Sequence, residues 1–84
     1  MYSVLLERAA ERDLRQLPAN IHNRVIRAIQ ALASEPRPAG CRKLTGSKND
    51  WRIRLGEDRI VYEIADAAHE VRVNRVRHRR DVYR

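Results

Sequence analysis

The spacing of apolar side chains changes near residue 40 and divides the chain into a helical half and a strand-forming half. Residues 2–6 form a short apolar run that is typical of a β-strand. Ala10, Leu14 and Leu17 then recur at i, i+4 and i+7, which predicts a helix over residues 7–17.

A second helix is predicted between two prolines. Pro18 suits a first helical turn, and the residue before Pro36 is disfavoured in helical geometry, so this helix should run to about residue 35. Its apolar face consists of Ile21, Val25, Ile29 and Leu32. Because so few residues separate the two helices, we expect them to form an antiparallel hairpin.

Beyond residue 40, apolar and polar residues alternate, as in strands with one buried face. The inward positions are Trp51, Ile53 and Leu55 in one strand and Ile60, Tyr62 and Ile64 in the next. A loop at 57–58 or at 56–59 pairs residue 55 with 60, 53 with 62 and 51 with 64. The opposite face then carries Arg52, Arg54 and Arg59, with Arg52 across from Glu63.

A last strand contains Val71 and Val73, but Val76 breaks the alternation, which indicates either a β-bulge or the end of the strand near residues 74–75. The predicted order is β-α-α-β-β-β. We therefore expect an α+β fold in one domain spanning residues 1–84, with the helix hairpin on one face of a small, mainly antiparallel sheet and a polar, basic face on the other side.

The charge of the chain points to an anionic partner. The 84 residues carry 18 Lys and Arg against 11 Asp and Glu, a net charge of +7, and 16 of the 18 cations are Arg. Arginine forms forked, bidentate contacts with phosphate and stays charged at any working pH. A polyanion or an acidic protein segment is therefore the expected partner.

Several classes of protein are disfavoured by composition. The lone cysteine, Cys41, excludes a disulfide within the chain and fits a reducing compartment. No apolar run approaches the roughly 18 residues of a membrane span, and no signal-peptide hydrophobic region follows Met1. His22, His69 and His78 lack metal-ligand spacing, so no metal or other cofactor is expected. We predict a cytoplasmic protein without a membrane partner.

The candidate site is the set of cations on the predicted basic face, together with the C-terminal residues. Arg52 and Arg54 would lie about 7 Å apart on one side of their strand, close to the spacing of neighbouring phosphates in a nucleic-acid strand. A basic sheet with an aromatic ring at its rim suits single-stranded nucleic acid. The full set is Arg42, Lys43, Lys48, Arg52, Arg54, Arg59, Arg77, His78, Arg79, Arg80 and Tyr83.

Four segments resemble the RelE/ParE toxin superfamily, and more narrowly its RelE-type messenger-RNA interferases. They are Lys43-Leu44-Thr45-Gly46, Trp51-Arg52-Ile53-Arg54-Leu55, Asp58-Arg59-Ile60-Val61-Tyr62-Glu63-Ile64 and Val76-Arg77-His78-Arg79-Arg80-Asp81-Val82-Tyr83. The resemblance covers essentially the whole chain, and its closing His-Arg-Arg-Asp-Val-Tyr string is the most specific part.

The resemblance implies a toxin of a bacterial type II toxin–antitoxin system. Such a toxin is a ribosome-dependent endoribonuclease that cleaves mRNA in the A site, without a metal, by attack of a 2′-hydroxyl on the adjacent phosphate. The implied partners are a RelB-like antitoxin, mRNA and the 70S ribosome, and DNA is contacted only through the antitoxin complex.

Carried over by position, Arg52 and Arg54 match two basic active-site residues, Arg59 the phosphate-binding Arg, Arg79 the C-terminal catalytic Arg and Tyr83 the active-site Tyr. RNA or ribosome contacts are expected from Arg42, Lys43, Lys48, Arg77 and Arg80. Arginine does not deprotonate in proteins, so proton transfer would fall to Tyr83, His78 or Lys43.

Two other readings use the same residues. A ParE-type toxin shares the fold, binds and inhibits DNA gyrase and needs no catalytic residues. A purely structural nucleic-acid module would rest on net charge alone. The joint presence of Arg59, Arg79 and Tyr83 favours the ribonuclease, since ParE-type chains tend to lose these residues.

Overall fold

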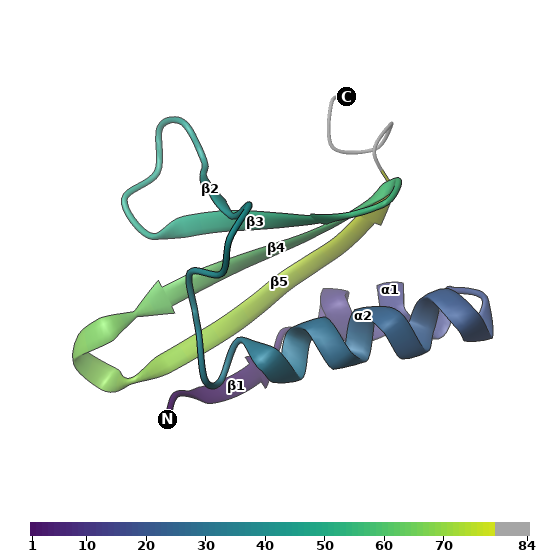
Figure 1. Cartoon of the computed structure of the whole chain (residues 1–84), viewed down its shortest axis with the longest axis horizontal. Coiled ribbons are helices and arrows are strands. Elements are labelled where there is room, and N and C mark those ends of the chain that lie inside the picture. Colours follow the sequence, from purple (N-terminus) through teal and green to yellow (C-terminus); the bar gives the residue numbers. More distant parts are fainter. Residues whose placement is uncertain (79–84) are drawn as a thin grey trace.

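The computed structural model describes residues 1–78 of the 84 (Figure 1). Its elements are β1 (Ser3–Leu6), α1 (Arg8–Arg15), α2 (Ala19–Ala31), β2 (Arg42–Lys43), β3 (Asp50–Leu55), β4 (Asp58–Ala65), the 3-10 turn η1 (Asp66–Ala68) and β5 (Glu70–His78). Arg79, Arg80 and Tyr83, which the sequence places in the site, lie outside the described residues.

The strands form one five-stranded sheet in the order β1-β5-β4-β3-β2. β1 runs parallel to β5, whereas the other neighbours are antiparallel. Both helices lie on the same side of this sheet (Figure 1). The predicted α+β architecture is confirmed, while the two-residue strand β2 and the parallel pairing of β1 were not anticipated.

The core lies between the helix hairpin and the inner face of the sheet, as the apolar periodicities require. Its buried side chains are Ala10, Leu14, Val25, Ile29, Leu32, Ile53, Ile60, Tyr62, Ile64, Val71, Val73 and Val76. The hydroxyl of Tyr62 donates a 2.7 Å hydrogen bond to the carbonyl of Pro36, so its polar atom is satisfied. Burial, the largest cause, raises the pKa of Tyr62.

The second helix is shorter than the sequence predicts. It ends at Ala31 rather than near residue 35. The next turns are closed by tighter i→i−3 bonds, from the N–H of Leu32 to the carbonyl of Ile29 and from that of Ser34 to Ala31. Such bonds satisfy the last carbonyls of a helix while they turn the chain, here toward Pro36 and the sheet.

The register of β3 and β4 differs by two residues from the prediction. Ile53 lies opposite Ile60, and the turn is formed by Gly56 and Glu57. The predicted pairing of Arg52 with Glu63 is therefore wrong: Arg52 faces Val61 and Glu63 faces Asp50.

The physical reason lies in the turn. Gly56 has φ +59°, and a two-residue hairpin loop favours glycine at its first central position. A shift of two residues leaves every side chain on its predicted face, so the apolar pattern alone could not distinguish the two registers.

The broken alternation in the last strand is a β-bulge, one of the two predicted explanations. Val61 pairs with Arg75 and Tyr62 with Val73, which leaves Asn74 as the extra residue. β5 therefore continues past the irregularity to His78 instead of ending there. This continuation brings the basic end of β5 beside β4.

Candidate nucleic-acid-binding face

Arginines from three strands lie side by side on the outer face of the sheet, the face away from the helices. Arg59 of β4 is directly opposite Arg54 of β3 on one side and Arg77 of β5 on the other. Residues directly opposite in antiparallel strands share a face, with Cβ atoms about 5 Å apart, and like charges there destabilise the sheet. We call Arg54, Arg59 and Arg77 the arginine row.

Arg59 is the most unusual member of this row. Its relative exposure is 2%, and among residues 1–78 its Nη1 donates to two backbone carbonyls, those of Asp58 at 3.3 Å and Gly56 at 3.5 Å. Within the described part of the chain, its Nε has no hydrogen-bond partner and it forms no ion pair. A buried cation without a carboxylate is costly, and an anion from outside would offset that cost.

A second pair of like charges lies beside the arginine row. Arg42 of β2 is directly opposite Arg52 of β3. These two side chains and Arg54 line a cavity of about 280 Å³, which also includes Ala39, Gly40 and Ile53. β2 is only two residues long, so β3 continues past its end and the cavity opens there. None of these lining residues is acidic, which suits an anionic ligand.

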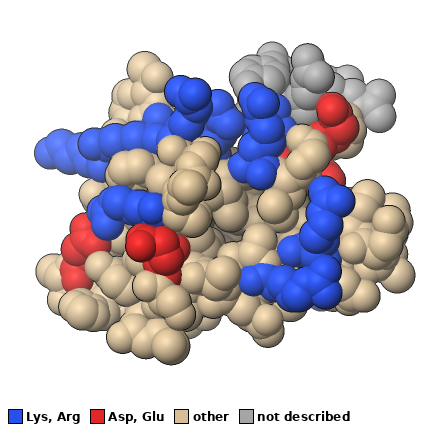
Figure 2. Space-filling view, in the orientation of Figure 1, with Lys and Arg blue, Asp and Glu red and all other residues tan. Residues whose placement is uncertain are grey.

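The positive charges are also visible on the molecular surface. Figure 2 shows Lys and Arg side chains gathered over the region of β2 and β3, with a second group between that region and α2. Lys43 and Lys48, both predicted to contact RNA, are exposed. Lys43 is opposite Trp51, so the register puts it on the helix side of this edge rather than beside Arg52.

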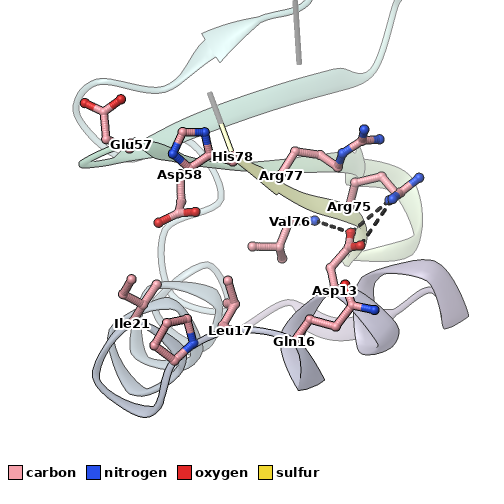
Figure 3. A pocket seen from close by; sticks show the side chains of 11 residues that line it. Asp13, Gln16, Leu17, Ile21, Glu57, Asp58, Arg75, Val76, Arg77 and His78 are labelled. Carbon is pink, nitrogen blue, oxygen red and sulfur yellow. Dashed lines mark hydrogen bonds and ion pairs between the residues drawn. The ribbon is translucent and has the colours of Figure 1, made fainter. Parts of the chain in front are cut away.

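His78 is separated from the arginine row. It lies opposite Asp58, and the register puts this pair on the same face as Ile60, the helix side of the sheet. It lines a larger cavity of about 650 Å³ between the helix hairpin and the ends of β4 and β5 (Figure 3). The walls of this helix-side cavity carry both signs of charge, including Asp13 and Arg75, so its lining is less suited to a polyanion.

Asp13 ties α1 to the bulged strand at the wall of the helix-side cavity (Figure 3). Its carboxylate accepts hydrogen bonds from Arg75 Nε at 2.8 Å, from Arg75 Nη2 at 3.1 Å and from the Val76 N–H at 2.9 Å. Partial burial opposes ionisation, but these bonds outweigh it and lower the pKa of Asp13. Arg75 thus pairs with a carboxylate, whereas no arginine of the row does so within the described part of the chain.

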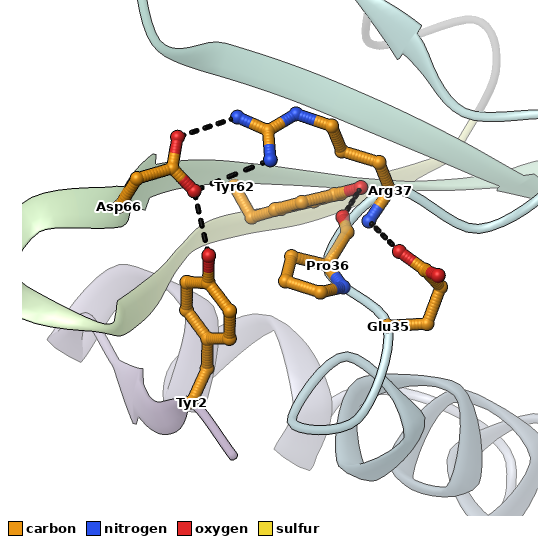
Figure 4. Close-up of polar contacts among 6 residues, drawn as sticks. All are labelled: Tyr2, Glu35, Pro36, Arg37, Tyr62 and Asp66. Atoms are coloured by element: carbon orange, nitrogen blue, oxygen red, sulfur yellow. Dashed lines mark hydrogen bonds and ion pairs between the residues drawn. The ribbon is translucent and has the colours of Figure 1, made fainter.

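The loop that forms one wall of the 280 Å³ cavity is held by a set of contacts that we call the Arg37–Asp66 clasp (Figure 4). Arg37 donates to both carboxylate oxygens of Asp66, at 2.8 and 3.2 Å, and its guanidinium lies 5.1 Å from the Trp51 ring centroid. The Tyr2 hydroxyl donates to the same carboxylate at 2.7 Å. These bonds, that of Arg37 foremost, lower the pKa of Asp66 to about 2.

The clasp was missed from the sequence because its members are far apart in the chain. Asp66 and Tyr2 are separated by 64 positions, and Arg37 lies in a proline-rich loop that offered no periodic signal. The Trp51 prediction is confirmed: the ring is partly buried against the core. His69 is exposed and stacks on Tyr2 with centroids 5.0 Å apart.

Two classes of site have no support in residues 1–78. No group of three or more His, Cys, Asp or Glu side chains there could hold a metal ion. No helix in the same residues is both long and apolar enough to cross a membrane.

Several solved structures with a similar fold are RelE toxins, alone or in complex with an antitoxin. The toxin–antitoxin complex RelBE2 from Mycobacterium tuberculosis matches with a TM-score of 0.82 and 31% identity, covering 93% of this chain and 98% of that one. The archaeal RelE–RelB complex from Pyrococcus horikoshii OT3 matches with a TM-score of 0.83 and 24% identity, covering 93% and 94%, which supports the fold. The fold and the arginine-rich sheet face thus define the class, a RelE-like toxin.

The family follows from two sequence comparisons. Residues 4–83 match the family model described as "ParE toxin of type II toxin-antitoxin system, parDE". Toxin RelG of Mycobacterium tuberculosis is 37% identical over 87 residues, which cover 99% of this chain and 97% of the relative. The chain belongs to the RelE/ParE family of type II toxin–antitoxin toxins, and its similarity to RelE-type complexes supports an antitoxin as its partner.

Proposed function

We propose that this toxin is a ribosome-dependent, metal-independent endoribonuclease that cleaves mRNA, and that a RelB-like antitoxin neutralises it. The observation that carries the proposal is the arginine row, whose central Arg59 is buried and has no ion-pair partner among residues 1–78. A protein that only needed a stable sheet would gain from a carboxylate or an apolar residue at this position. The row therefore supports binding of an external anion, and an RNA phosphate fits it.

The two arginine pairs fit two successive phosphates of one strand. Arg42 with Arg52 and Arg54 with Arg59 are cross-strand pairs. Their β3 members are two residues apart, about 7 Å along the strand. In this proposal the scissile phosphate lies at Arg54 and Arg59, and its neighbour lies in the 280 Å³ cavity.

The chemistry proposed at the scissile phosphate is attack by the adjacent 2′-hydroxyl oxygen. A new P–O bond forms, the bond to the 5′-oxygen breaks, and a 2′,3′-cyclic phosphate and a 5′-hydroxyl result. The charge that builds up on the phosphate oxygens is stabilised by guanidinium groups that are already in position, usually the largest contribution to such catalysis. Arg79 is proposed to join Arg54 and Arg59 in this role.

Proton transfer is proposed to fall to Tyr83. The 2′-hydroxyl must lose a proton and the 5′-oxygen must gain one, and arginine does neither. The opposite-face register of His78 and the position of Lys43 across from Trp51 weigh against these two alternatives. With so few acid–base groups, cleavage should depend on orientation of the strand by the ribosome, because precise positioning supplies effective molarities on the order of 10⁵ M or more.

The test is primer extension on a message under translation in vitro, with the purified toxin. Discrete cuts within codons are expected for the wild type, and none with Arg54→Ala/Arg59→Ala. Arg72→Ala is the matched control, because it removes an arginine from the other end of the same sheet face. Uncut messages with the wild type, or cuts that persist in Arg54→Ala/Arg59→Ala, would overturn the proposal.

The description of the matching family model, a ParE toxin, favours a second candidate, a non-catalytic inhibitor of DNA gyrase. This candidate is tested by a supercoiling assay in parallel with the primer extension. Inhibited supercoiling beside an intact message would assign the toxin to the ParE branch, and the arginine row would then be a binding surface.

A further inference from the structure

Asp58, at the start of β4, is a buried carboxylate that faces the helix-side cavity. Its relative exposure is 7%, and it is one of the residues that line the cavity. Because alternate residues of a strand share a face, Asp58 lies on the same side of the sheet as Ile60, toward the helix hairpin. Figure 3 shows its carboxylate pointing from the sheet toward Leu17 and Ile21. The carboxylate is therefore directed into the cavity and away from the arginine row.

The described part of the chain contains no partner for this carboxylate. No ion pair there includes Asp58, and none of its side-chain oxygens accepts a hydrogen bond. The arginines of the cavity lining are directed elsewhere: Arg75 pairs with Asp13 at 2.8 Å, and the register puts Arg77 on the outer face. Burial of a charge without a partner is costly, so a cation from outside would offset that cost.

The remaining walls of the cavity favour a ligand with an apolar chain. Leu17, Pro18 and Ile21 of the helix hairpin and Val76 of β5 belong to the same lining. The volume of about 650 Å³ lies within the range of sites that enclose small molecules. A carboxylate beside apolar side chains suits an ammonium group on an aliphatic chain, because the chain packs against the walls while the cation donates to the carboxylate.

Other classes of ligand fit these walls less well. A metal ion requires several oxygen ligands, whereas Asp58 is a single carboxylate beside apolar side chains. An anion would be repelled by Asp58 but attracted to the 280 Å³ cavity, which is lined by Arg42, Arg52 and Arg54. The two cavities therefore favour ligands of opposite charge.

We propose that the helix-side cavity binds a small aliphatic amine, whose ammonium group donates to Asp58 and whose chain packs on Leu17, Ile21 and Val76. The site lies on the side of the sheet opposite the arginine row, so it goes beyond the proposed function and does not depend on it. A bound amine would supply a partner for the buried carboxylate. It would therefore stabilise the folded toxin, since it binds the folded state and not the unfolded chain.

The test is a titration of the purified toxin with n-hexylammonium, followed by amide chemical shifts in NMR spectra. Shifts are expected at Asp58, Leu17 and Ile21, with a Kd of about 1 mM or tighter. Asp58→Asn keeps the shape of the side chain and removes its charge, so it should weaken binding about tenfold or more. Asp50→Asn is the matched control, because it removes an equal charge from the outer face, and it should change Kd less than about twofold.

Two further ligands and one further variant separate charge from packing. n-Hexanol has the same chain without the charge, and methylammonium has the charge with almost no chain, so each should bind at least about tenfold more weakly than n-hexylammonium. Asp58→Glu keeps a carboxylate and should retain binding within about threefold. A loss in Asp58→Asn that Asp58→Glu does not share is then assigned to the charge and not to a folding defect.

Three outcomes overturn the proposal: no binding of n-hexylammonium by the wild type, equal losses in Asp58→Asn and Asp50→Asn, or n-hexanol binding as tight as that of the amine. Weaker antitoxin binding by Asp58→Asn, with no amine binding by the wild type, would also overturn it and make Asp58 a contact for a partner protein. Primer extension with Arg54→Ala/Arg59→Ala reports on the arginine row alone, so either proposal can fail without the other.

Discussion

Two rows of charged residues cross the outer face of the same three strands, and they differ in how their charges are matched. Near the β4–β5 connection, Asp50, Glu63 and Arg72 lie opposite one another, and Arg72 also contacts the Glu70 carboxylate at 3.1 Å. At the other end lies the arginine row, three guanidinium groups without a carboxylate among them.

This difference indicates that one end of the sheet face contributes to stability, whereas the other is suited to binding an anion. Opposite charges across strands contribute about 0.2–1 kcal/mol each, whereas like charges cost a similar amount. In the mixed row, Arg72 opposite Glu63 and paired with Glu70 offsets the repulsion between Asp50 and Glu63, so this row needs no ligand to balance its charges. The arginine row raises the free energy of the unliganded fold, and an anion that binds it recovers this cost.

The largest effect is expected from Arg59→Met, which removes the central charge of the arginine row and keeps a long apolar stem. Cleavage in a translating system should fall about 100-fold or more, as expected when a preorganised cation is lost. The free energy of unfolding should rise by about 1 kcal/mol, because an unpaired buried charge is removed. Primer extension and urea unfolding measure the two quantities, and a destabilised but fully active variant would contradict the comparison.

Arg77→Glu would convert the arginine row into a mixed row. The new carboxylate would lie opposite Arg59, as Glu63 lies opposite Arg72, and would neutralise Arg59. We expect RNA binding to fall about tenfold while the midpoint of thermal unfolding rises, since a like-charge pair becomes an opposite-charge pair. Arg77→Gln is the control: it removes the repulsion without adding an anion, so its loss of RNA affinity should be smaller.

Arg75 lies in β5 between the two rows, and it pairs with a carboxylate of the same chain, that of Asp13 in α1. It therefore extends the comparison. Asp13→Ala would remove three hydrogen bonds at once and leave the Val76 N–H and the Arg75 guanidinium without this acceptor. The expected loss of unfolding free energy is about 2–3 kcal/mol, as for hydrogen bonds to charged groups. Urea unfolding measures it, and cleavage by the folded fraction should be retained.

The smallest effect concerns the Arg37–Asp66 clasp and its pH dependence. The hydrogen bond from Arg37, and after it that from Tyr2, lowers the pKa of Asp66 to about 2, whereas the unfolded value is near 4. This carboxylate therefore stabilises the fold above about pH 4, and the stabilisation is lost as pH falls toward 2. Asp66→Asn should show a shallower loss of unfolding free energy between these pH values. If the free energy of unfolding of Asp66→Asn falls with pH as steeply as that of the wild type, the clasp does not contribute to stability in acid.

The alternation of apolar residues predicted which face each strand residue occupies, and this part of the prediction was accurate. Ile53, Ile60 and Tyr62 point into the core, and Arg54 and Arg59 share the other face. The exact partners were not predictable from the same pattern, because a shift of two residues leaves all faces unchanged. Only the glycine at position 56 could have selected the observed turn.

The sequence identified the candidate site residues but did not predict their burial or their contacts. The arginines were recognised from charge and from their resemblance to family motifs, but nothing in the sequence indicated that Arg59 is buried. Its burial depends on tertiary packing, as do the clasp and the Asp13 contacts, which join residues more than 25 positions apart. The separation of His78 from the row follows from the bulge at Asn74 and the extension of β5, which the sequence left open.

The parallel pairing of β1 with β5 affects when the protein can fold relative to its synthesis. The first strand to be synthesised finds its neighbour only in the last one, with Ser3 opposite Glu70. Contacts between such distant residues slow folding, since a long loop must close before they form. Strands β2 to β5 are consecutive antiparallel neighbours that can pair in order, but β1 remains without its partner until β5 has been made. The toxin therefore completes its fold only after the whole chain is made, a delay during which an antitoxin already present can meet it.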